Sequence, residues 1–153
     1  MAAAEALARA AHAGQLDKAG QPYAAHPQRV AARVADDPIA AAVAWLHDVV
    51  EDTDIDLGDL RDKGFPEPVV QAVGLLTRRD EVAADDYYRA IRADPIALRV
   101  KLADLADNSD PVRLAALDEP TRARLQAKYA HARAVLTAAQ DQPDQANQAN
   151  QAN

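Results

Sequence analysis

The segment from Pro38 through Glu51 restricts the fold more than any other part of the chain. Its sequence, PIAAAVAWLHDVVE, is apolar around almost the whole circumference of a helix and has no continuous polar face. A helix of this kind has to be surrounded by other elements. Elsewhere apolar residues recur at spacings of three and four, and the alternation typical of strands is hard to find. The sequence therefore predicts an all-α domain packed around this central helix.

Prolines and glycines divide the rest of the chain into further helices. Nearly every proline lies near an expected helix start, where its missing N–H breaks no hydrogen bond. Besides 38–51, we expect helices near residues 2–13, 26–37, 53–64, 69–76, 80–93, 95–108 and 118–139. The sequence thus predicts a single helical bundle of about seven or eight helices.

The chain is long enough for one compact domain, which we place at residues 1–139. Residues 140–153 follow as a Gln/Ala/Asn-rich tail that contains a three-fold Gln-Ala-Asn repeat and no core residue. A segment of this composition cannot bury enough apolar surface to fold, so we predict that the tail is disordered.

Charge and composition limit the partners of the domain. A net charge of −7 and a pI of about 5.0 disfavour nucleic acid and anionic membranes, but a small phosphorylated ligand fits if a local cation is present. There is no cysteine, which excludes disulfides and thiolate metal sites and fits a reducing compartment. The N-terminus lacks the features of a signal peptide, and no apolar run could span a bilayer. We expect a soluble, cytoplasmic protein, and nothing in the sequence indicates its oligomeric state.

The stretch WLHDVVED places a histidine and three carboxylates in the most apolar helix. On a helix His47 and Asp48 are about 100° apart, so that their side chains can converge on one ion. Glu51 and Asp52 follow one turn later, over the first pair. Groups of this kind in an apolar neighbourhood need solvent, a salt-bridge partner or a metal ion to compensate them.

Two further residues could complete a metal site. His26 opens one of the central helices, and Asp104 lies beside the buried side of IALRVKLADLADN. Together with His47 and Asp48 they form a nitrogen and oxygen set that suits manganese, iron, magnesium or zinc, with open positions for water and a phosphate oxygen. Without thiolates or an HExxH motif, a structural zinc site or a zincin is disfavoured. The alternative is a buried network of hydrogen-bonded structural residues.

Three segments carry a resemblance to a known family. AHAGQLDKAGQPYAAHPQRVA, AVAWLHDVVEDTDI and VKLADLADN resemble, in this order, segments of the RelA/SpoT-type (p)ppGpp hydrolase domain, which belongs to the HD superfamily of metal-dependent phosphohydrolases. The resemblance covers most of residues 8–110. Because the chain is too short for the synthetase domain of the bifunctional enzymes, we expect a stand-alone domain like the small alarmone hydrolases.

The resemblance implies an activity and a role for each matching residue. The reaction would be removal of the 3′-pyrophosphate from the alarmone, giving GDP or GTP, at one divalent ion, typically Mn²⁺. The implied metal ligands are His26, His47, Asp48 and Asp104. The implied catalytic residues, which handle the water and its protons, are Glu51 and Asp52. The implied substrate contacts are Lys18 with phosphate oxygens and Asn108 with the nucleoside.

Two departures from the family pattern leave the substrate open. Asp17 stands where the family's loop usually has a basic residue, and residues 105–111 do not continue as an Arg-Leu-His-Asn-Met-type run. An anion beside a polyphosphate opposes binding. Within the enzyme class, the alternative is a nucleotide phosphatase acting on NADPH or a nucleoside monophosphate. Outside it, the alternatives are an HD module that binds a nucleotide without turnover, and a plain helical interaction protein.

Overall fold

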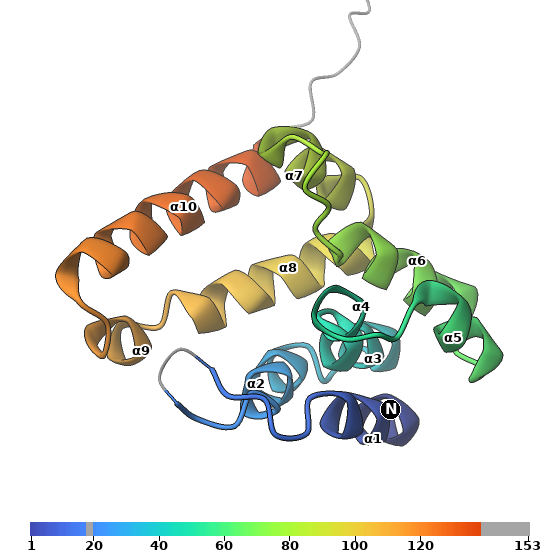
Figure 1. The fold of residues 1–153 in the computed structure, drawn as a ribbon. Coiled ribbons are helices and arrows are strands. Elements are labelled where there is room, and N and C mark those ends of the chain that lie inside the picture. The colour runs from blue at the N-terminus through green and yellow to red at the C-terminus, as the bar shows by residue number, and fades with distance from the viewer. Residues whose placement is uncertain (18–19, 139–153) are drawn as a thin grey trace, which may run out of the picture.

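A computed structural model describes residues 1–17 and 20–138, and within this part the chain is all-α, as predicted (Figure 1). Its only β pairing there is an isolated bridge between Leu16 and Pro22. The helices of the described part are α1 (Ala2–Ala11), α2 (Ala25–Arg33), α3 (Pro38–Leu46), α4 (Val49–Asp52), α5 (Leu57–Asp62), α6 (Glu67–Leu76), α7 (Ala84–Arg92), α8 (Pro95–Asn108), α9 (Pro111–Ala115) and α10 (Glu119–Thr137). The predicted tail at 140–153 lies outside the described residues.

Several helices begin with the same Asp-Pro pair. Asp37 precedes α3, Asp94 precedes α8 and Asp110 precedes α9, and each carboxylate accepts hydrogen bonds from two backbone N–H groups of the first turn. The proline that follows each aspartate has no N–H to leave unpaired. These starts confirm the prediction that prolines mark helix N-termini.

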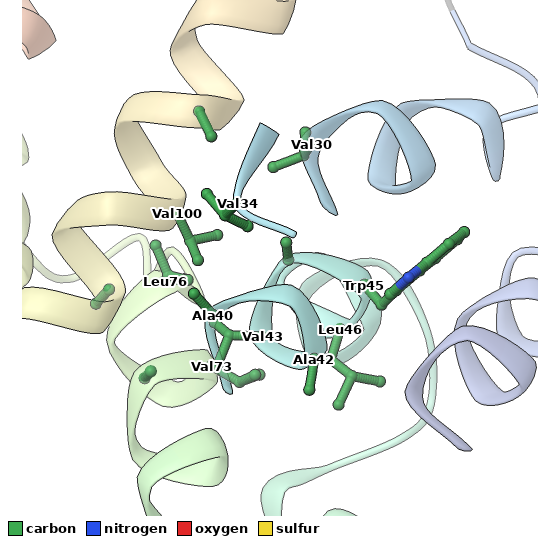
Figure 2. Close-up of a cluster of buried hydrophobic side chains, with 14 of the residues drawn as sticks. Val30, Val34, Ala40, Ala42, Val43, Trp45, Leu46, Val73, Leu76 and Val100 are labelled. Atoms are coloured by element: carbon green, nitrogen blue, oxygen red, sulfur yellow. The ribbon is translucent and has the colours of Figure 1, made fainter. Parts of the chain in front are cut away.

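The core surrounds α3, as expected from its lack of a polar face. All residues from Ala40 to Leu46 are buried, and α3 packs against α1, α2, α6 and α8. Figure 2 shows Val30 and Val34, Val73 and Leu76, and Val100 pointing at α3 from three directions. Trp45 is a core residue as predicted, with the Arg9 guanidinium 5.0 Å from its ring centroid.

The predicted continuous helix over 38–51 is wrong in one respect. α3 ends at Leu46, residues His47 and Asp48 form a turn, and α4 begins at Val49. In a continuous helix the carbonyl of Ala44 would accept from the N–H of Asp48, but here it lies 2.7 Å from His47 Nδ1. The imidazole of His47 therefore takes the place of a backbone N–H at the Ala44 carbonyl, and the helix is interrupted at the His47-Asp48 pair.

The expected number of seven or eight helices is also too low for the described part of the chain. One extra helix results from the break between α3 and α4, and the other is α9, which has only five residues. Five residues are too few for apolar periodicity to reveal a helix.

α8 connects most of the bundle. It packs against α2, α3, α6, α7 and α10, and it runs through the middle of the molecule in Figure 1. α10 lies on the opposite side of α8 from α1 and α2, and it contacts α7 and α8. Among the described helices, none has the length and apolar character that a bilayer crossing requires.

Leu46 offers a test of this packing. Its side chain is completely buried at the end of α3, so that Leu46→Ala should leave a cavity and lower the free energy of unfolding by about 2–5 kcal/mol. Urea unfolding followed by circular dichroism measures this change. The control, Leu16→Ala, truncates a leucine that is 62% exposed and should change stability by less than about 0.5 kcal/mol. Equal losses in both variants would contradict the central place of α3.

Candidate metal centre and its cavity

Four side chains from three parts of the fold meet at one point. His26 comes from α2, His47 and Asp48 from the turn between α3 and α4, and Asp104 from α8. The Nε2 atom of His26 lies 3.2 Å from Asp104 Oδ1 and 3.7 Å from Asp48 Oδ2. The Nε2 atom of His47 lies 3.1 Å from Asp48 Oδ2 and 3.9 Å from Asp104 Oδ1. Three segments that are far apart in sequence therefore bring the four candidate ligands together in space.

Their arrangement fits a divalent metal ion. Ligand atoms of His26, His47 and Asp104, all buried, lie within 4.8 Å of one another. His47 Nδ1 faces the Ala44 carbonyl, to which it can only donate, which leaves Nε2 as the ring nitrogen available to an ion. That Nε2 is buried and has no hydrogen-bond partner in the described part of the chain. A metal ion would satisfy it, and the mixed imidazole and carboxylate set suits Mn²⁺, Fe²⁺, Mg²⁺ or Zn²⁺.

Neighbouring groups hold the two carboxylates in place. The Tyr23 hydroxyl donates to Asp48 Oδ2 at 2.5 Å. Lys101 Nζ donates to Asp104 Oδ2 at 2.8 Å, and Asn108 Nδ2 donates to Asp104 Oδ1 at 2.5 Å. Such outer partners restrict the orientation of metal ligands and tune their basicity.

The charges of the cluster shift its ionisation. Burial alone would lower the pKa of His26, but its hydrogen bonds to Asp104 and Asp107 and the nearby carboxylate charges raise that pKa to about 9. Burial alone would raise the pKa of Asp48, but the charges of the two histidines lower it to about 2. For Asp104, burial is likewise outweighed, mainly by the charge of Lys101, and its pKa falls well below the usual range. Both carboxylates are therefore ionised at neutral pH, as ligands of a cation must be.

The cluster opens into a cavity of about 1150 Å³ between α2, the α3–α4 turn and the segment from α7 to α10. Six cationic side chains line it beside six carboxylates, so that it is richer in positive charge than the acidic chain as a whole. The cationic residues are Arg29, Arg33, Arg78, Lys101, Arg113 and Lys128. Tyr23, Tyr87, Tyr88 and Tyr129 also line it. The volume and the cations suit a small phosphorylated ligand.

The two predicted catalytic carboxylates lie in different surroundings. Glu51 lines the cavity, and its Oε2 accepts from the backbone N–H of Arg78 at 2.8 Å. Partial burial of its carboxyl group, together with the charges of Asp48 and Asp52, raises the pKa of Glu51. Asp52 Oδ2 accepts a hydrogen bond from Gln15 Nε2 at 3.4 Å, and Asp52 is not among the described residues that line the cavity. The geometry thus favours Glu51 over Asp52 as the group that meets a water molecule.

Of the two predicted substrate contacts, the structure describes only Asn108. Lys18 lies outside the described residues. Asn108 lines the cavity, but its amide nitrogen donates to Asp104, which links it to the metal centre. Asp17, the departure in the loop, also lines the cavity, and its Oδ2 lies 3.7 Å from an Arg113 nitrogen.

Sequence reasoning missed Tyr23, Lys101 and Asp107, which contact the cluster, and Arg29, which binds Asp107. Tyr23 and Arg29 lie three positions before and after His26, and Asp107 lies three positions after Asp104. Residues three apart share a helix face, so that Arg29 and Asp107 could have been found from this spacing. Asp107 is 1% exposed and lies 2.8 Å from His26 Nδ1.

Known proteins resemble this chain over part of their length. A guanosine-3′,5′-bis(diphosphate) 3′-pyrophosphohydrolase of Haemophilus influenzae is 33% identical over 132 residues, which are 80% of this chain and 20% of that protein. A GTP pyrophosphokinase of Streptomyces coelicolor is 35% identical over 114 residues, which are 67% of this chain and 13% of that protein. The chain therefore spans a fifth or less of the length of these relatives. No family model matches it.

One solved structure supports the fold. It is described as a metazoan ortholog of SpoT that hydrolyzes ppGpp and plays a role in starvation responses. It superposes with a TM-score of 0.72 at 24% sequence identity, and the match covers 89% of this chain and 84% of that one.

Proposed function

We propose that this chain, a homologue of the RelA/SpoT-type (p)ppGpp hydrolases, is a metal-dependent (p)ppGpp 3′-pyrophosphohydrolase. The resemblance predicted from three sequence segments is confirmed by relatives that carry this name. The observation that carries the proposal is the convergence of two imidazoles and two carboxylates at the end of a cavity whose lining includes arginine and lysine side chains.

The residues that would hold the ion are His26, His47, Asp48 and Asp104, and the ion we propose is Mn²⁺. When bound, a divalent ion lowers the pKa of a coordinated water molecule, to about 7 in the best cases, and withdraws charge from a phosphoryl oxygen. Asp48 and Asp104 supply two negative charges, which make the site selective for a cation over a neutral ligand.

Glu51 is the group proposed to receive the proton of the attacking water. The water oxygen forms a bond to the phosphorus attached to the 3′ oxygen, and the bond between that phosphorus and the 3′ oxygen breaks. The 3′ oxygen leaves with a proton, so that the products are pyrophosphate and GDP or GTP. The raised pKa of Glu51 makes its carboxylate a better proton acceptor than a glutamate with the ordinary pKa.

The cavity cations are proposed to compensate the phosphate charges. Arg78 and Lys101 line the cavity on the side of Glu51 and Asp104, and Lys128 lines it from α10. Positive groups placed where charge develops stabilise a phosphoryl-transfer transition state. The predicted contacts of Lys18 with phosphate and of Asn108 with the nucleoside remain part of this proposal.

Asp17 supports a second candidate, a nucleotide phosphatase of different specificity. Its carboxylate lies at the cavity beside Arg113, where it opposes a polyphosphate and favours a ligand with fewer negative charges at that end. NADPH and nucleoside monophosphates are the substrates to compare.

The deciding experiment is a turnover assay with Mn²⁺ and ppGpp, with NADPH, GTP and nucleoside monophosphates in parallel. Anion-exchange chromatography resolves the products. We expect ppGpp to release pyrophosphate, and we expect a chelator to stop the release and added Mn²⁺ to restore it. Phosphate release from another nucleotide, with ppGpp intact, would replace the substrate and keep the chemistry. Nucleotide binding without turnover would favour a non-catalytic HD module.

A further inference from the structure

Asp107 is a buried carboxylate outside the set of metal ligands. It is 1% exposed, and its Oδ2 lies 2.8 Å from His26 Nδ1. The other nitrogen of the same ring, Nε2, faces Asp104 and Asp48 at 3.2 and 3.7 Å. The imidazole of His26 is therefore held between Asp107 on one side and the candidate metal centre on the other.

Two arginines compensate the charge of Asp107. Arg29 binds it in bidentate fashion, with Nε 2.8 Å from Oδ1 and a terminal nitrogen 3.0 Å from Oδ2. A nitrogen of Arg113 lies 3.4 Å from Oδ2. A bidentate guanidinium fixes the plane of a carboxylate, so that the oxygen facing His26 cannot rotate away without breaking these bonds. Asp107 is thus a rigid acceptor.

We propose that Asp107 is a positioning residue that orients His26 for the metal ion. It accepts the Nδ1–H of His26, so that Nε2 would be the nitrogen that binds an ion held beside Asp48 and Asp104. The inference rests on the proposed metal centre and goes beyond it, because neither the ligand set nor the roles implied by the resemblance include residue 107. His47 has an analogous arrangement with a neutral partner, the carbonyl of Ala44. A carboxylate partner raises the basicity of the imidazole more than a carbonyl does.

The test compares Asp107→Asn and Asp107→Ala with the wild-type chain, each stripped of metal and titrated with Mn²⁺ by isothermal calorimetry. Removal of an outer partner of a metal ligand weakens binding by about 10–100-fold, which we expect for the alanine variant. The asparagine can still accept from Nδ1–H through its amide oxygen, so that it should recover part of this loss. Asp36→Asn is the matched control, because it removes a carboxylate paired with Arg99 on the exposed surface.

The outcomes separate the positioning role from other roles. If wild type and Asp107→Ala bind Mn²⁺ equally, the positioning role is overturned while the metal centre stands. If the wild-type chain binds none of Mn²⁺, Fe²⁺, Mg²⁺ and Zn²⁺, both the metal centre and the positioning role of Asp107 are refuted. A purely structural role would lower the melting temperature of the metal-free variant and leave its Mn²⁺ affinity unchanged, which also overturns the inference. If the alanine variant does not fold, a weaker Mn²⁺ affinity of a folded Asp107→Asn variant supports the role, and an unchanged affinity refutes it.

Discussion

Asp48→Ala is expected to abolish Mn²⁺ binding and turnover together. Asp48 Oδ2 lies within 3.7 Å of both imidazole Nε2 atoms, and its pKa of about 2 keeps it ionised in the working range. Removing a residue that hydrogen-bonds a metal ligand lowers metal affinity by about 10–100-fold. Removing a direct ligand should therefore lower Mn²⁺ affinity by more than about a hundredfold. Calorimetric titration with Mn²⁺ and the pyrophosphate-release assay measure the two effects on the same preparation.

The matched control for this variant is Asp36→Ala. Asp36 pairs with Arg99 at 2.5 Å and is 73% exposed, so that its removal changes the net charge equally while leaving the cavity untouched. We expect wild-type affinity and turnover in this control, and unchanged circular dichroism in both variants. Full activity of Asp48→Ala would show that the ion binds elsewhere. If turnover is lost while Mn²⁺ affinity stays at the wild-type value, Asp48 contacts the substrate and is not a metal ligand.

Glu51→Gln is expected to lower kcat by about 10²–10⁴-fold, the usual contribution of a general base. Glutamine keeps the shape of the side chain and can still accept from the N–H of Arg78, but it cannot take a proton. Mn²⁺ affinity should stay close to the wild-type value, which distinguishes this variant from Asp48→Ala. Steady-state kinetics and calorimetry on the same samples provide the comparison.

The pH dependence of kcat is an independent test of Glu51 as the general base. A base acts in its deprotonated form, so that activity falls as the pH drops through its pKa, and burial raises the pKa of Glu51 above the ordinary glutamate value. The acid limb of the wild-type kcat profile should therefore lie above the pKa of an exposed glutamate. Glu67→Gln, at an exposed ion pair with Arg61, should leave kcat and the limb unchanged. A limb that survives in Glu51→Gln would assign it to another group.

The sequence predicted the helices well because their starts are local. Asp37-Pro38 and Asp94-Pro95 carry their own capping groups, and apolar spacing then extends each helix without reference to the rest of the fold. The turn at His47 was missed because apolar residues continue on both sides of it. Its cause is a side-chain contact with the Ala44 carbonyl, which periodicity does not encode.

The structure brings the candidate ligands together, but the sequence did not indicate their surroundings. His26 and Asp104 are 78 positions apart, and their motifs sufficed to pair them. Asp107 and Arg29 are just as far apart, and no motif signals their ion pair. The gathering of arginines and lysines at the cavity was hidden for a related reason, since a net charge of −7 sums over the whole chain and says nothing of which charges come together after folding.

The position of α8 has a consequence for how this domain can evolve. One set of its residues, Ala97, Val100 and Ala103, is buried in the bundle, while Lys101, Asp104, Asp107 and Asn108 face the cavity or the metal centre. α10, although longer, buries only Leu125, Ala132 and Leu136. In a library of random variants selected for function, accepted substitutions should therefore be sparse along α8 and frequent along α10. Sequence drift in this domain would be concentrated on the part of α10 that faces away from the cavity, whereas Leu125, Lys128 and Tyr129, which line the cavity, would change as little as α8.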